Sequence, residues 1–176
     1  ACFLVIDQLR LFGSPVLSVL IRLETQYYFA LIALLLPGVF LIYRSPWAAL
    51  DAGFGLGAFL APLWLLLHAE AIANEGWEFL APDHAVLASS IVWLLVLEAV
   101  RRVTGWVLFG IALVFSMYPL FADLMPLMIS GMAIGFRETA SYHAMSIESI
   151  VGLPFRAFAN LVVGFLVFGA TLQHTG

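Results

Sequence analysis

The chain has 176 residues, of which 64% are hydrophobic and only 10% are charged, and its formal net charge is −4. A soluble globular domain averages roughly 45–50% apolar and about 25% charged residues, so this composition indicates a protein that lives in a lipid bilayer. Nucleic-acid binding needs a clustered basic face, and here only Arg101 and Arg102 are adjacent, so we expect no nucleic-acid partner.

The first part of the chain has two short amphipathic or apolar segments. Residues 1–12 form an apolar run that is too short to span and is interrupted by Asp7 and Arg10. We interpret this run either as the trailing half of a helix whose beginning is missing or as a frayed terminal helix. From residue 14 to residue 26, polar side chains recur at every fourth position, which predicts an amphipathic helix in the membrane interface.

Longer uncharged apolar blocks follow, and a membrane-spanning helix needs roughly 20 such residues. The blocks cover residues 25–43, 52–67, 85–97, 103–122 and 157–173, the second of them being short, and the helix that begins at residue 85 is expected to continue to Arg102. We therefore predict an all-α integral membrane protein. It would be a polytopic helix bundle of about four complete spans plus a partial N-terminal one, together with the interfacial amphipathic helix.

The block at 52–67 also carries a pattern of small residues. Gly53, Gly57 and Ala61 are spaced by four positions, so they share one helix face, and small residues at that spacing let helix backbones approach closely. The sequence predicts helix packing at this face. The same stretch superficially resembles a nucleotide-binding loop, but no strand precedes it, so we reject that interpretation.

Arginine placement predicts the orientation. The positive-inside rule assigns Arg44, Arg101 and Arg102 to the cytoplasm as anchors. The acidic segment 70–83, which contains Glu75 and Glu78, then lies outside, as does the helix at 14–26. This topology is self-consistent only if a first span precedes residue 1, so we expect that the sequence is truncated at its N-terminus.

Few polar residues could carry chemistry. His68, Glu70 and His84 could form a metal cluster, but their spacing matches no strong ligand pattern, and the favoured interpretation is ordinary interfacial polarity. Glu98 precedes Arg101 and Arg102 by three and four residues, which predicts ion pairs on one helix face. A proton-relay role for Glu98 is the alternative.

Two further polar sites have simple interpretations. Asn160 in the last block is expected to donate a hydrogen bond between helices. Ser141, Tyr142 and His143 are neighbours in sequence, which does not define a catalytic triad. We expect no catalytic residue, no metal site and no cofactor in this chain.

A family resemblance rests on three stretches. Residues 97–113, LEAVRRVTGWVLFGIAL, resemble the "LEA-RR--GW-L-IAL" run of the fused membrane subunits of tripartite ATP-independent periplasmic (TRAP) transporters. Residues 16–44 are similar to a segment of the small-subunit part of that family. Residues 145–176 are similar to the opening of the large subunit. The resemblance covers nearly the whole chain in order, and its central motif is the most specific part.

The resemblance implies a division of the chain. Residues 1–102 would be small-subunit-like scaffold helices, 103–123 a connecting transmembrane helix, and 124–155 an extracytoplasmic connector. Residues 156–176 would be the first span of a large-subunit-like transport part, truncated here. The substrate-binding residues would then lie beyond Gly176.

The resemblance also implies a function. The chain would be the scaffold of a secondary active permease that takes up an organic anion, with sodium coupling, through an elevator-type mechanism in a bacterial or archaeal inner membrane. Its partners would be the lipid bilayer, the remainder of the fused permease and a periplasmic receptor of the TAXI type, with Glu75, Glu78 and Arg137 facing the receptor. An accessory or structural membrane subunit of another complex is the alternative, and an intramembrane enzyme is the third.

Overall fold

The computed structural model of this chain describes residues 24–43, 45–126 and 129–175. Within those ranges every regular element is a helix, which confirms the all-α prediction for the described part. Arg44 and the predicted segment 1–12 lie outside the described residues, as does most of the predicted interfacial helix at 14–26. Gln26, the last polar residue of that helix, belongs instead to the next helix and is buried there.

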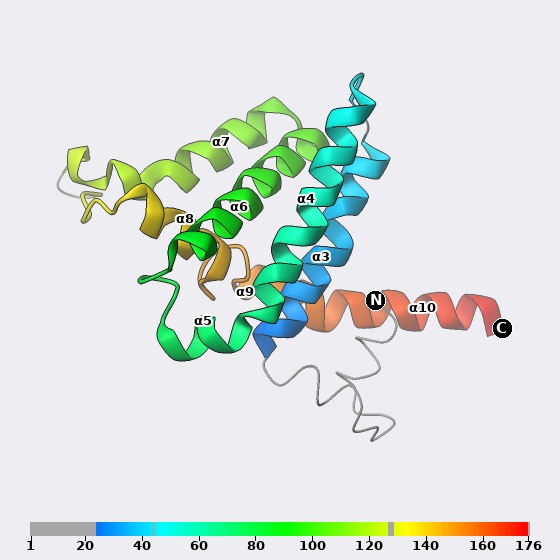
Figure 1. Cartoon of the computed structure of the whole chain (residues 1–176). Coiled ribbons are helices and arrows are strands. Elements are labelled where there is room, and N and C mark those ends of the chain that lie inside the picture. The colour runs from blue at the N-terminus through cyan, green and yellow to red at the C-terminus, as the bar shows by residue number, and fades with distance from the viewer. Residues whose placement is uncertain (1–23, 44, 127–128, 176) are drawn as a thin grey trace.

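Helices α3 (Glu24–Ile42) and α4 (Ala48–Leu67) form a long antiparallel hairpin (Figure 1). Both are apolar along most of their length, so the size of the side chains, more than their polarity, distinguishes the packed face. α3 buries large aromatic residues such as Phe29 and Phe40, whereas α4 buries Ala58, Ala61 and Leu65 at helical spacing. These residues share one apolar core, and the small side chains of α4 allow the two helices to pack closely.

Helix α6 (Asp83–Thr104) completes a three-helix bundle with this hairpin. The short helix α5 (Ala69–Glu75) turns the chain at the end of α4, and α6 then returns against α4 and α3. Its buried residues Val92, Leu95 and Ala99 recur every three to four positions and join the same core. We refer to these three helices as the α3–α4–α6 bundle.

Gly105 ends α6 and reverses the chain. Its φ of +85° lies in a region that favours glycine, and α7 (Trp106–Met117) then runs back along α6 (Figure 1). The sequence predicts one helix over 103–122, and the structure differs. The uncharged stretch is divided at Gly105, and beyond α7 it tightens into the 3₁₀ turns η1 (Tyr118–Leu120), which contains Pro119, and η2 (Ala122–Leu124).

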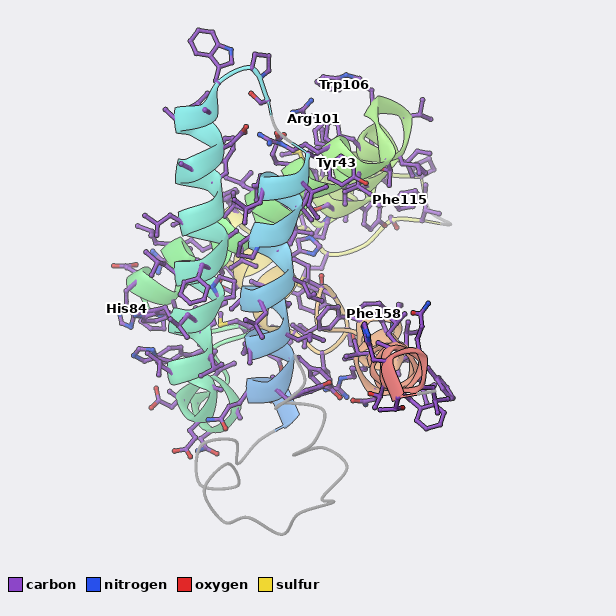
Figure 2. The ribbon with its side chains drawn as sticks, turned by 90° about the vertical axis from the view of Figure 1, so that its right-hand side faces the viewer. Tyr43, His84, Arg101, Trp106, Phe115 and Phe158 are labelled. Carbon is purple, nitrogen blue, oxygen red and sulfur yellow. The ribbon has the colours of Figure 1, made fainter. Side chains whose placement is uncertain are left out.

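The last third of the described chain contains one helix that packs on α6 and one helical segment that projects away from the bundle. Helix α8 (Phe136–Met145), within the predicted connector 124–155, packs on α6. The chain then continues through α9 (Leu153–Ala157), the π-helical segment η3 (Phe158–Val162) and α10 (Val163–Thr175). α10 lies crosswise to α3 and α4 in both views (Figures 1 and 2), and most of its apolar side chains are exposed.

Three helical stretches of the described residues are long and apolar enough to cross a membrane: Thr25–Ile42, Ala48–Leu67 and Leu153–Thr175. The apolar stretch Trp106–Leu120 is shorter than these three. α6 is 22 residues long but carries a charge at its start and three in its last two turns. The prediction of about four complete spans is therefore met only in part, and three such helices indicate a membrane protein.

Candidate functional site

Four charged side chains join the end of α6 to the turn between α3 and α4. Glu98 accepts hydrogen bonds from Arg101 Nε and Nη2 at 2.7 and 2.6 Å and from Arg102 Nε at 2.8 Å. Arg102 Nη1 donates to Asp51 Oδ1 at 2.8 Å and to the Tyr43 carbonyl at 2.9 Å. The Arg102 and Asp51 side chains are only 6% and 7% exposed. We call Asp51, Glu98, Arg101 and Arg102 the Arg102 cluster.

The charges of this cluster are matched within it. Two guanidinium groups face two carboxylates, and Asp51 Oδ2 also accepts from the Ser45 backbone N–H at 2.7 Å. The Arg102 guanidinium lies 4.9 Å from the ring centre of Phe40 and 5.6 Å from that of Phe54, so aromatic faces cover the charge. The predicted ion pairs of Glu98 are confirmed. Such full pairing is what a buried charged group requires and supports a structural role.

The residues predicted to face a receptor lie at the opposite end of the bundle. Figure 2 shows Tyr43 and Arg101 together at one end, with His84 toward the other. Glu75 is exposed and accepts a hydrogen bond from Trp77 Nε1 at 2.8 Å, and Glu78 is half-buried. Arg137, at the start of α8, pairs with Asp83 at 2.6 Å. The fold thus brings Arg137 to the acidic segment 70–83, although the two are far apart in sequence.

A small open pocket lies at this same end. Its volume is about 210 Å³, and it combines apolar walls from the segment before α6 with polar groups from α8. The Ser141 hydroxyl, which is buried, has no hydrogen-bond partner among the described residues. The lining residues are Phe79, Leu80, Ala81, Val86, Arg137, Glu138 and Ser141.

His68 and His84 lie together, but among aromatic rings. The His68 ring stacks on Trp64 with centroids 3.9 Å apart, and His84 approaches Trp64 and Trp77 edge-on at 5.4 and 5.8 Å. His68 Nδ1 is also 2.9 Å from the Trp64 carbonyl oxygen. Among the described residues no group of three or more His, Cys, Asp or Glu side chains could hold a metal ion.

His143 joins three elements through neutral contacts. Its Nε2 lies 2.7 Å from the Ser116 carbonyl oxygen, so this nitrogen carries the proton and donates it. Nδ1 then accepts from the Ser149 hydroxyl at 2.7 Å. The ring stacks on Trp93, whose Nε1 donates to the Ser116 hydroxyl. Burial lowers the pKa of His143, so the fold favours the neutral imidazole.

The predicted packing face on α4 is only partly used. Ala61 is buried, and a Cβ placed on Gly57 would meet Leu95 Cδ1 at 3.4 Å and Ile91 Cγ2 at 3.9 Å. At Gly53, in contrast, no atom of a neighbouring element within the described ranges lies within 4 Å of such a Cβ. The contact with α6 is therefore at Gly57.

Two tyrosines near the start of α3 contact the projecting helical segment that runs from α9 to α10. The Tyr27 hydroxyl donates to the Ala159 carbonyl in the π-helical segment at 2.9 Å. Asn160 Nδ2 donates to the Tyr28 hydroxyl at 3.3 Å, which agrees with the inter-helix bond predicted for Asn160. The Arg156 guanidinium lies 5.2 Å from the centre of the Tyr28 ring. These contacts connect segments that are 132 residues apart in sequence.

Sequence reasoning missed Asp51 and Trp93. Asp51 had a usable signal, since a lone carboxylate near the start of an apolar helix is expected to have a partner inside the protein. Its partner, Arg102, could not be named without knowing that α6 returns against α4. Trp93 had no such signal, because a tryptophan in an apolar block is typical of any membrane helix.

Comparison of this chain with protein-family models, curated proteins and solved structures finds no match.

Proposed function

We propose that this chain is the scaffold part of a TRAP-type permease of the fused, TAXI-associated kind. The complete transporter would take up an organic anion with sodium and would lie in a bacterial or archaeal cytoplasmic membrane. Its mobile part would move as an elevator against this scaffold, and a periplasmic receptor would deliver the substrate from outside. Residues 103–123 would connect the scaffold to the transport part.

The observation that carries the proposal is the arrangement of the motif at 97–113. Several of its polar residues and Gly105 gather at one corner of the fold, where α6 ends and α7 begins. Arg102 and Glu98 bind within the Arg102 cluster, Gly105 supplies the positive φ, and Trp106 lies 4.9 Å below the Arg101 guanidinium. A motif with several members that stabilise one corner is expected in a rigid scaffold, and this supports the proposal.

The charge distribution along the bundle supports the orientation. Arg101 and Arg102 lie at one end, which the positive-inside rule would place in the cytoplasm. The opposite end carries Glu75, Glu78 and the exposed pair of Asp83 and Arg137. Exposed charges at the rim of a docking surface mainly steer association, so this end is suited to meet a soluble receptor.

Charge reversal in the complete transporter tests the proposal. Glu75→Lys and Arg137→Glu should lower receptor-dependent uptake most strongly at low ionic strength, where exposed charges are least screened. Thr104→Lys adds a charge at the opposite end of the bundle, where Thr104 is exposed, and should leave uptake unchanged. Uptake that is insensitive to both reversals over the whole range of receptor concentration would contradict the proposed receptor-facing role of this end of the bundle.

A further inference from the structure

An open apolar groove runs along one side of the α3–α4–α6 bundle. Its volume is about 330 Å³, within the lower range of ligand-binding pockets, and its walls are almost wholly hydrocarbon. Three parts of the chain meet there, namely α3, α6 and the segment that runs from Ile150 into α9. The lining residues are Ile32, Leu35, Leu36, Val39, Val96, Ile150 and Phe155.

A basic side chain lies next to this groove. Arg156 follows Phe155 directly, and both contact the ring of Tyr28, Arg156 from 5.2 Å and Phe155 from 6.2 Å between centres. Arg156 Nε is buried and has no hydrogen-bond partner among the described residues. Arg101, Arg102 and Arg137 each pair with a carboxylate, whereas no described carboxylate pairs with Arg156.

The order of these residues along α3 places the charge at one end of the groove. Tyr28 comes one helical turn before Ile32, and the groove then extends to Val39, about 10 Å further along the helix axis. Tyr28 is also close to the start of the apolar stretch Thr25–Ile42. In a bilayer, the charge would therefore lie near the surface, and the groove would extend from it toward the hydrocarbon centre.

We propose that this groove and Arg156 form a binding site for an anionic phospholipid. The acyl chain would lie along α3 between Ile32 and Val39, and the phosphate would accept hydrogen bonds from the Arg156 guanidinium. Guanidinium groups bind phosphate through paired N–H donors, and the guanidinium of half-buried Arg156 is not paired with a described carboxylate. Tyr28 would mark the headgroup level, where aromatic residues are enriched.

The occupant follows from the charge and the position. A protein segment covering the groove would need an acidic group at one end and an apolar run beyond it, at the depth of the membrane surface. An anionic lipid has this arrangement in every molecule and is present at high concentration around the site. The proposal depends on residence in a bilayer and is independent of transport.

Native mass spectrometry of the 176-residue chain in detergent tests the site, with phosphatidylglycerol and phosphatidylcholine of identical acyl chains as probes. The chain should retain phosphatidylglycerol in preference to phosphatidylcholine, and the lipid should raise the unfolding temperature. Arg156→Gln should weaken phosphatidylglycerol binding by about tenfold, the loss expected for a hydrogen bond to a charged group. Leu35→Trp, which fills the groove, should remove binding of both lipids.

Matched variants separate the site from general effects. Leu34 is 48% exposed and Leu35 is 42% exposed, but only Leu35 lines the groove, so Leu34→Trp should bind lipid normally. Arg137→Gln should also bind normally, and Arg156→Lys should recover most of the preference for phosphatidylglycerol. Circular dichroism checks that each variant is folded, and if Arg156→Gln is not, Arg156→Lys and Leu35→Trp decide the question.

Three results would overturn the proposal. Equal retention of the two lipids by the unchanged chain would exclude a preference for anionic lipid. Stabilisation by inorganic phosphate alone, to the same extent as by phosphatidylglycerol, would exclude the groove as the source of binding. Normal lipid binding by folded Leu35→Trp would show that the acyl chain of the lipid does not lie in the groove.

Discussion

Two polar contact sites join helices inside this apolar protein, and one of them is charged whereas the other is neutral. The Arg102 cluster uses full charges, with two arginines matched by Glu98 and Asp51. The contacts of His143 use a neutral imidazole between a carbonyl and a hydroxyl. The difference follows from the partners: a charge is stable in a buried place only when an opposite charge is present, and His143 has none among its contacts.

The two sites also differ in what they connect. The Arg102 cluster joins α6 to the turn of the α3–α4 hairpin and so fixes the register of the α3–α4–α6 bundle. His143 joins α8 to the end of α7 and to the turn that precedes α9. The α3–α4–α6 bundle should therefore lose stability when one of its charges is removed. The packing of α8 should weaken when His143 gains a charge.

The largest effect is expected from Arg102→Met. It removes one side of the buried ion pair with Asp51, and breaking a buried ion pair typically costs about 3–5 kcal/mol of unfolding free energy. Denaturant unfolding in detergent measures the change. Arg101→Met is the control, because Arg101 is 29% exposed and its pair should contribute about 1 kcal/mol or less. Equal losses for the two variants would contradict the assigned role of Arg102.

A second comparison lies within α4 and concerns packing alone. Gly57→Leu should destabilise the bundle by about 1–3 kcal/mol, because the added side chain meets Leu95 and Ile91 of α6. Gly53→Leu makes the same chemical change where the described residues leave open space, so it should be close to neutral. Thermal unfolding in detergent compares them, and a larger loss at Gly53 than at Gly57 would mean that α4 packs through the other face.

The sequence predicted the parts of the fold that depend on local composition. Residues 25–43 and 52–67 contain helices because uncharged apolar runs of that length satisfy their backbone only as helices. The ion pairs of Glu98 followed from spacing on a single helix. These inferences needed no knowledge of which helices are neighbours.

The remaining features depend on tertiary contacts or on backbone angles. The lack of charge over 103–122 does not show that the chain reverses at Gly105, because the reversal depends on the positive φ of that glycine. The spacing of the small residues in α4 predicted a shared helix face, but it did not predict which of these residues contact a neighbouring helix. Gly53 lies outside the contact with α6. Asp51 and Arg102 are brought together only by the return of α6, so the centre of the cluster could not be read from sequence.

The smallest expected effect concerns protonation of His143. Its pKa is lowered in the folded protein by burial, so the unfolded chain binds the proton more readily. The stability linked to His143 is therefore complete above about pH 6.5, the usual value for histidine, and is lost as the pH falls toward the lowered value. The unfolding temperature should therefore decrease as the pH is lowered from 7.5 to 5.5. This pH dependence would distinguish the contacts of His143 from those of the permanently charged Arg102.

Two histidine variants make that measurement specific. His143→Gln removes the titrating group and should flatten the pH dependence, at the cost of some stability at pH 7.5 from the lost contacts with Ser116 and Ser149. His84→Gln changes an exposed histidine and should keep the dependence of the unchanged chain. If His143→Gln keeps the full pH dependence of the unfolding temperature, the proton that destabilises the fold binds to another group. The packing of α8 would then not depend on a neutral imidazole in the way that the α3–α4–α6 bundle depends on its paired charges.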